Sequence, residues 1–187
     1  MAHPFYSIGH GTRAIGDFIE LLHSVDVTHL VDVRTVPRSR TNPQYNRDSL
    51  PQTLAPSGIG YEHLASLGGL RGRERTVAPD VNAFWQNDSF HNYADYAMSD
   101  RFRGGLAHLR ALGQKQCCAI MCAETVWWRC HRRIITDYLL AAGETVFHVL
   151  GPGHVEAAAM TDAARAQAAG VLVYPAEPAV QGDLFDR

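Results

Sequence analysis

The segment from residue 117 to residue 140 constrains the fold of this chain more than any other stretch. It opens with an apolar run, residues 117–122, that has the length and character of a buried strand. Apolar side chains then recur at helical spacing from Ile134 to Leu140. Strand, loop and helix in this order predict that the loop lies beyond the carboxyl end of a strand, where open α/β sheets bind ligands. That loop and the first helical turn hold the reactive side chains Glu124, Trp127, Trp128, Arg129, Cys130, His131, Arg132 and Arg133.

Short apolar runs alternate with helical periodicity along the rest of the chain. The pattern predicts strands at residues 5–8, 29–34, 59–64, 145–150 and 171–174, in addition to 117–122. It predicts helices at residues 15–25, 102–113 and 157–169, with an irregular helical insertion at residues 82–99. The alternation predicts an α/β fold: a doubly wound, mostly parallel, Rossmann-like three-layer sheet with helices on both faces. We expect a single domain over residues 1–174 and a flexible tail over residues 175–187.

Composition excludes several classes of protein. The chain of 187 residues has a net charge of -2, so it is not a polybasic nucleic-acid binder as a whole, although a local basic face is compatible with that charge. No apolar run has the length of a membrane span, and the first residues lack the pattern of a signal peptide. All four cysteines lie between residues 117 and 130, and the adjacent Cys117 and Cys118 face opposite sides of their strand. We therefore expect no disulfide framework, a cytoplasmic location and no membrane partner.

Four blocks of the sequence together resemble a known family. They are residues 7–11, residues 30–34 with Pro37, Ser39 and Arg40, residues 60–69, and residues 122–124 with residues 130–132. In content and order these blocks resemble the family catalogued as domain of unknown function 488. The resemblance implies an α/β fold whose loops meet on one side of the sheet, and it implies little about activity. Residues 125–128 depart from many relatives, in which the resemblance leads us to expect a charged residue and a proline.

Two carboxylates, Asp32 and Glu124, end neighbouring predicted strands. A carboxylate held ionised beside arginine can activate water or stabilise a cationic transition state, as in glycosyl transfer. The other interpretation is that each carboxylate pairs with an arginine and only fixes its loop. His10 lies at the same predicted edge and is suited to move protons at neutral pH. We expect one cleft to collect Asp32, Arg34, Arg40, Glu124, Cys130 and His131 together with His10.

Cys122 ends its predicted strand, where a helix N-terminus and arginines can stabilise a thiolate. A rhodanese-like sulfurtransferase also has an Asp-Val-Arg strand end, present here at residues 32–34, and a cysteine that begins an anion-binding loop. The other interpretation is that the cysteines are small core residues. Cys130 and His131 do not have a zinc-binding spacing with Cys122, so we expect a local hydrogen-bond network and neither a metal nor a cofactor. The candidate catalytic residues are Glu124, Asp32, His10, Cys122 and His131.

Arginines and aromatic residues are interleaved in the loops of this predicted edge. Arginine forks bind phosphate, and aromatic faces stack bases, including a base flipped out of a duplex. The other interpretation is that these side chains are solvated loop arginines and core indoles. The candidate substrate-binding or phosphate-binding residues are Arg34, Arg38, Ser39, Arg40, Tyr45, Arg71, Trp127, Trp128, Cys130 and Arg132.

The tail carries a separate motif, Gln181-Gly182-Asp183-Leu184-Phe185. It resembles the short peptide with which bacterial replication and repair proteins dock on the sliding clamp. A flexible tether, one amide and a Leu-Phe pair suit an apolar pocket, so Gln181, Leu184 and Phe185 are the candidate partner-binding residues. Gly182 replaces the usual leucine of that peptide, and a chance match in a short tail is the other interpretation.

These observations lead to three hypotheses for function. The first is an enzyme that acts on DNA or nucleotides in DNA repair, with hydrolase-type or glycosylase-type chemistry at a carboxylate beside an arginine-lined phosphate site. The second is a rhodanese-like sulfurtransferase or thiol enzyme that uses Cys122 as its nucleophile. The third is a non-catalytic module that binds DNA or a partner protein.

Overall fold

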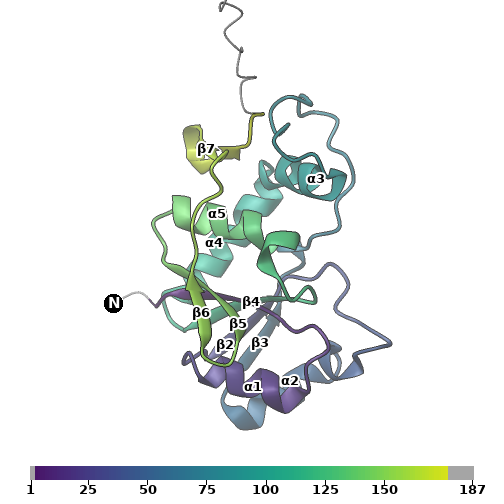
Figure 1. The fold of residues 1–187 in the computed structure, drawn as a ribbon, viewed down its shortest axis with the longest axis vertical. Coiled ribbons are helices and arrows are strands. Elements are labelled where there is room, and N and C mark those ends of the chain that lie inside the picture. The colour runs from purple at the N-terminus through teal and green to yellow at the C-terminus, as the bar shows by residue number, and fades with distance from the viewer. Residues whose placement is uncertain (1–2, 177–187) are drawn as a thin grey trace, which may run out of the picture.

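The centre of the molecule is a sheet of six strands, which Figure 1 shows in the computed structural model, where residues 3–176 are described. The strands lie in the order β3-β2-β4-β1-β5-β6. All neighbouring pairs are parallel except β5 and β6, which are antiparallel. The bounds are Phe5–Gly9 for β1, His29–Asp32 for β2, Gly60–His63 for β3, Cys118–Cys122 for β4, Val146–Gly151 for β5 and His154–Ala157 for β6.

Helices cover both faces of this sheet (Figure 1). On one face, α1 (Ile15–His23) and α2 (Leu50–Leu54) bury Phe18, Leu22 and Leu50 against alternate residues of the strands. On the other face, α4 (Asp100–Gly113) and α5 (Arg132–Ala141) do the same, and α3 (Asp88–Ala97) extends that layer. Cys117 belongs to the first core and Cys118 to the second, as alternation along a strand requires. The prediction of a doubly wound, mostly parallel three-layer sheet is confirmed.

The positions of β1 and β4 create a crossing point. The two strands are hydrogen-bonded neighbours, with Gly9 beside Cys122 at their carboxyl ends. After β1 the chain runs to α1 on one face of the sheet, and after β4 it runs to α5 on the other. Chains that leave neighbouring strands towards opposite faces open a crevice at that edge, which is where sheets of this type bind ligands.

The prediction of a helix at residues 157–169 is wrong. Gly151 and Gly153 flank a tight turn, in which Gly153 has a φ of +66°, and the chain returns as β6 along the edge of β5. Further on, β7 (Arg165–Ala166) pairs with β8 (Leu172–Val173) in a small separate sheet that includes the last predicted strand. The alanine-rich composition favours a helix only weakly. Tertiary pairing takes its place at both ends of the segment, where Ala157 pairs with β5 and Arg165–Ala166 pair with β8.

Within residues 3–176, no helix combines the length and the apolar character that crossing a membrane requires.

Candidate active site

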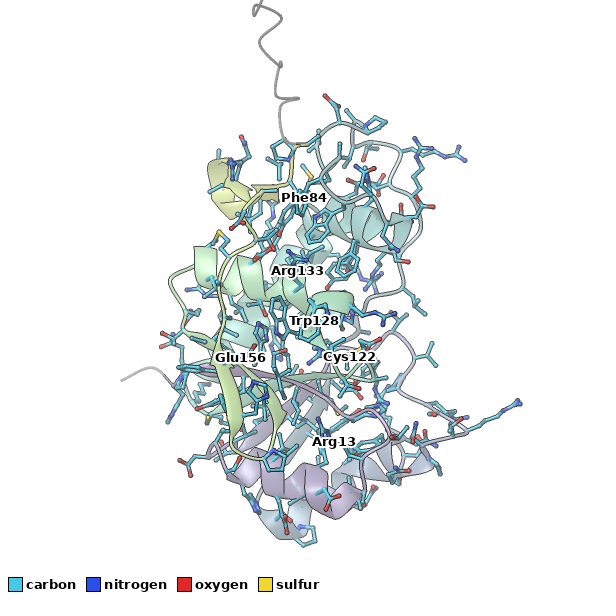
Figure 2. All side chains as sticks on the ribbon, in the orientation of Figure 1. Arg13, Phe84, Cys122, Trp128, Arg133 and Glu156 are labelled. Carbon is cyan, nitrogen blue, oxygen red and sulfur yellow. The ribbon has the colours of Figure 1, made fainter. Side chains whose placement is uncertain are left out.

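A cleft of about 300 Å³ opens at the carboxyl ends of β2 and β4, beside the N-terminus of α5. Figure 2 shows Cys122, the last residue of β4, between the sheet and the helical layer that contains α5. Segments from different parts of the chain converge there. The lining residues are Arg34, Thr35, Val36, Gly69, Leu70, Ser89, Phe90, Cys122, Ala123, Glu124, Arg129, Cys130 and His131.

Arg132 is a buried cation at the base of this cleft, with 1% of the residue exposed. Its Nη1 donates to Ser7 Oγ at 3.1 Å and its Nη2 to the backbone oxygen of Glu124 at 2.5 Å. Its Nε donates to Cys130 Sγ at 3.3 Å. Among residues 3–176, no carboxylate oxygen lies within 4.0 Å of this guanidinium. A buried charge needs a counterion, and the ionisable acceptor in contact with Arg132 is the sulfur of Cys130.

The surroundings of Cys130 favour the thiolate. Burial by itself raises the pKa of Cys130, but a hydrogen bond from Cys122 and the charges of Arg132 and His131 outweigh burial and hold the pKa well below its ordinary value. Cys122 shows the opposite shift, because its hydrogen bond to Cys130 and its own burial raise its pKa. The two thiols therefore differ: Cys130 carries the negative charge, and Cys122 keeps its proton and donates it.

His131 is held in a defined orientation beside the thiolate. Its Nε2 lies 2.8 Å from the backbone oxygen of Val33, and because a carbonyl can only accept, Nε2 carries the proton. Its Nδ1 then points towards Cys130 Sγ at 3.5 Å. The ring packs so closely on Gly69 that a Cβ at that position would lie 2.4 Å from Nδ1, so only glycine leaves room for the ring. Nδ1 of His131 is therefore placed to exchange a proton with the thiols.

Cys122, Cys130 and His131 are also the donor types that zinc takes, and their donor atoms all lie within 4.8 Å of one another. The guanidinium of Arg132 is bonded to one of these sulfurs, however. A cation placed among the three donors would be repelled by that neighbouring charge. The donor set therefore suits thiol chemistry better than it suits a metal ion.

Asp32 and Arg34 form a second guanidinium network at the same edge of the sheet. Arg34 donates through Nε to Asp32 Oδ1 at 2.9 Å and through Nη2 to Oδ2 at 2.6 Å. Tyr61 donates its hydroxyl to Oδ2 at 2.7 Å, and Arg34 also bonds the backbone oxygen of Tyr45 at 2.7 Å. Asp32 is fully buried and does not line the cleft, whereas Arg34 lines the cleft while its guanidinium is held by Asp32.

His10 is buried behind Arg34. Its Nδ1 lies 2.8 Å from the backbone oxygen of Gly11 and carries the proton, and its Nε2 faces Arg34 Nη1 at 3.3 Å. The ring stacks on Tyr45 at 4.1 Å between centroids. Burial, with a further contribution from the charge of Arg34, lowers the pKa of His10 to about 4. His10 is therefore a neutral structural histidine at pH 7, and the stack also covers one face of the buried Tyr45 ring.

Glu124 is an exposed carboxylate on the wall of the cleft. Its side chain accepts one long hydrogen bond, from the backbone nitrogen of Val126 at 3.5 Å. Within the described part of the chain, no cation lies within ion-pair distance of it. Its backbone is fixed from two sides, because it accepts from Arg132 and because a Cβ at Gly9 would lie 2.0 Å from its carbonyl oxygen.

The other arginines predicted to bind phosphate lie away from the cleft lining. Arg38 pairs with Asp48 in solvent, and Arg40 is exposed. Arg71 folds back to the backbone oxygens of Ala65 and Gly68 and covers the ring of Tyr96. Ser39 fixes its own loop by accepting from the backbone nitrogen of Asn42.

The two tryptophans lie outside the cleft lining. Trp127 stacks on His148 at 4.3 Å between centroids, and Trp128 meets Trp127 edge to face. Trp128 is 46% exposed, so its ring is accessible at the surface. Of the residues predicted for the site, the cleft lining collects Arg34, Cys122, Glu124, Cys130 and His131.

Sequence reasoning did not select several residues that line the cleft. They are the apolar Val36, Leu70 and Phe90, together with Gly69 and Ser89. The adjacent glycines at residues 68–69 were a usable signal, since glycine marks places where another group approaches the backbone closely. The partner-binding residues predicted in the tail, Gln181, Leu184 and Phe185, lie outside the described residues.

Comparison with known proteins gives one match. The family model described as "Domain of unknown function DUF488" matches residues 14–139, which is more than half of the chain and includes every residue that lines the cleft. No curated protein matches the sequence, and no solved structure matches it.

Proposed function

The chain belongs to the DUF488 family, and we propose that it is a thiol-dependent enzyme whose nucleophile is the thiolate of Cys130. The observation that carries this proposal is the buried guanidinium of Arg132, which contacts Cys130 Sγ and has no carboxylate partner among residues 3–176. Burying an unpaired charge is costly, so this arrangement stabilises an anionic sulfur in a cleft. A lowered thiol pKa beside a positive charge is the usual basis of cysteine nucleophilicity.

Each neighbour of the sulfur has a defined part in the proposed reaction. The thiolate of Cys130 attacks an electrophilic atom of a substrate held in the cleft, and the bond to the leaving group breaks. Arg132 holds the sulfur in its charged form before attack. His131 lies with Nδ1 3.5 Å from Sγ and is the group best placed to give a proton to the leaving group and to take one back.

The proposal can be tested without knowing the substrate by alkylation with iodoacetamide at pH about 6, where an ordinary thiol is almost fully protonated. Mass spectrometry of the digested protein should find Cys130 labelled first and fastest. Cys118, which is fully buried and has its pKa raised by burial to about 12, is the internal control and should stay unlabelled. Labelling of Cys130 no faster than Cys118 would contradict the proposal.

A second candidate function is supported by Glu124. This carboxylate is exposed on the cleft wall beside Arg129, which also lines the cleft. A free carboxylate near a cation suits hydrolytic or glycosyl-transfer chemistry on a nucleotide or on DNA, in the DNA-repair setting that the tail motif suggests. Under this proposal Glu124→Gln abolishes turnover in a screen of modified DNA duplexes while Cys130→Ser retains it, and under the thiolate proposal the two outcomes are exchanged.

A further inference from the structure

Two thiols share the cleft, although four cysteines are present in the chain. Cys122 and Cys130 have their sulfur atoms within 4.8 Å of each other, and His131 offers a ring nitrogen within the same distance of both. Cys117 and Cys118 lie at the opposite end of β4, in the cores on the two faces of the sheet. The close pair is therefore formed by one residue from the end of β4 and one from the loop two residues before α5 begins.

We propose that Cys122 is a resolving thiol for Cys130, so that the cleft reduces organic disulfides. This inference rests on the proposed role of Cys130 as the nucleophile. It adds the substrate class and a second reactive residue, neither of which the role of Cys130 alone requires.

The first step consumes the thiolate. Cys130 Sγ attacks one sulfur of a disulfide RS–SR′, a bond forms between Cys130 and the RS sulfur, the substrate S–S bond breaks, and R′S⁻ leaves. The leaving thiolate takes its proton from solvent or from a protonated His131. Cys130 is now a mixed disulfide, and it no longer accepts the hydrogen bond that Cys122 donates in the resting protein.

The second step uses the proton acceptor that the structure already orients. Cys122 gives its proton to Nδ1 of His131, whose Nε2 proton remains bonded to Val33. The resulting thiolate attacks Cys130 Sγ, the disulfide between Cys122 and Cys130 forms, and RS⁻ leaves and takes the proton from Nδ1 of His131. Two electrons have passed from the two cysteines to the substrate, which becomes two thiols, and a dithiol reductant restores the reduced protein.

The mouth of the cleft favours a substrate with an apolar substituent. Val36 is 61% exposed and Leu70 is 74% exposed, and both line the cleft together with Phe90. Exposed apolar side chains that border a reactive group gain stability when a carbon-rich ligand covers them. A neutral aromatic disulfide should therefore react faster than a doubly anionic one.

The test uses the reduced full-length protein and dithiodipyridine, a neutral aromatic disulfide whose released thiopyridone absorbs light. The expected result is rapid release of two equivalents per chain. The chain mass should fall by two hydrogens, and peptide mapping should join Cys122 to Cys130. Cys122→Ser should release one equivalent and keep the mixed disulfide on Cys130. Cys118→Ala is the matched control and should behave like the unaltered protein, and the dianionic dithiobis(nitrobenzoate) should react more slowly.

The possible failures separate this inference from the function on which it rests. A mixed disulfide that persists on Cys130 in the unaltered protein would overturn the resolving role and leave the nucleophile in place. Slow reaction of all four cysteines would overturn both. Stoichiometric zinc that blocks the reaction and is lost in both Cys122→Ser and Cys130→Ser would also overturn it, because the pair would then be a metal site.

Discussion

Two buried arginines lie at the carboxyl edge of one sheet and are satisfied in different ways. Arg34 is paired with Asp32, a fully buried carboxylate that also accepts from the hydroxyl of Tyr61. Arg132 is paired with Cys130, a sulfur that hydrogen-bonds weakly. The two oxygens of the carboxylate accept hydrogen bonds from all of its donors, so this ion pair is not a reactive group. The thiolate is polarisable and nucleophilic, and its pair faces the cleft, so the same cation fixes a loop in one place and prepares a reactive group in the other.

The difference also predicts how each network responds to loss of its cation. Neutral pH lies far above the ordinary carboxyl pKa of about 4. A carboxylate that loses its cation can therefore be neutralised by a proton only at a high free-energy cost. Neutral pH lies below the ordinary thiol pKa of about 8.5. A thiolate that loses its cation therefore regains its proton at little free-energy cost. The carboxylate network should therefore carry more of the stability of the fold, and the thiolate network more of the reactivity.

Replacing Arg34 with methionine should give the largest effect. The change leaves Asp32 buried without a cation, which typically costs about 3–5 kcal/mol of unfolding free energy. Urea denaturation at neutral pH measures that loss. Arg38→Met is the matched control, because Arg38 pairs with Asp48 in solvent and such a pair contributes about 1 kcal/mol or less. Equal losses in the two variants would contradict the structural role of the Asp32 pair.

Acidification should cost nearly as much, because two buried histidines, His10 stacked on Tyr45 and His148 stacked on Trp127, are neutral in the folded protein. Burial lowers the pKa of both His10 and His148 from 6.5 to about 4. Between these values the unfolded chain binds more protons than the folded chain, so stability falls as the pH falls from about 6.5 to about 4. The shift corresponds to about 3 kcal/mol for each histidine.

His148→Phe separates the two contributions. Phenylalanine keeps a ring to stack on Trp127 and cannot bind a proton, so the variant should lose about 3 kcal/mol less than the parent over the same pH window. Denaturation curves at pH about 7 and about 4 measure the difference. His154→Phe, at an exposed position on β6, is the control. An unchanged pH dependence in His148→Phe would show that His148 does not titrate as its burial requires.

Replacing Arg132 with methionine should lower the stability less than Arg34→Met does, and it should lower the reactivity of Cys130 more. The change leaves Ser7 Oγ and the backbone oxygen of Glu124 without their donor, a loss of about 1–3 kcal/mol. Cys130 can take up a proton in response, so its alkylation at pH about 6 should fall to the rate of an ordinary buried thiol. A loss of stability larger than that of Arg34→Met, with alkylation unchanged, would reverse the proposed division between the two networks.

The sequence predicted the sheet well because its strands are short apolar runs that end in polar residues. Asp32 and Cys122 both end strands where expected, and they lie at the same edge. The error at residues 157–169 arose because alanine content reports only local preference. Pairing of Ala157 with β5 and of Arg165–Ala166 with β8 took the place of that preference, and such pairing is not visible in a local pattern.

Sequence reasoning named five of the residues that line the cleft, Arg34, Cys122, Glu124, Cys130 and His131. Its first hypothesis gave the chemistry to Glu124, its second used Cys122 as the nucleophile because it ends a strand, and it placed Cys130 among the binding residues. The distinction between the two thiols depends on which sulfur is contacted by the guanidinium of Arg132, the first residue of α5. The sequence gives the separation of Cys130 and Arg132 but not which neighbouring sulfur the guanidinium reaches.

The central claim is that Cys130 is a thiolate at neutral pH, and an NMR titration of the cysteine β-carbons in selectively labelled protein tests it most directly. The four cysteines provide three controls within the same molecule. We predict that Cys130 titrates well below the ordinary thiol pKa of about 8.5, while Cys117, Cys118 and Cys122 titrate above it or stay protonated. If Cys130 instead remains a thiol through neutral pH like the other three cysteines, its sulfur is not an anionic partner for Arg132. That result would contradict the thiolate account of this site.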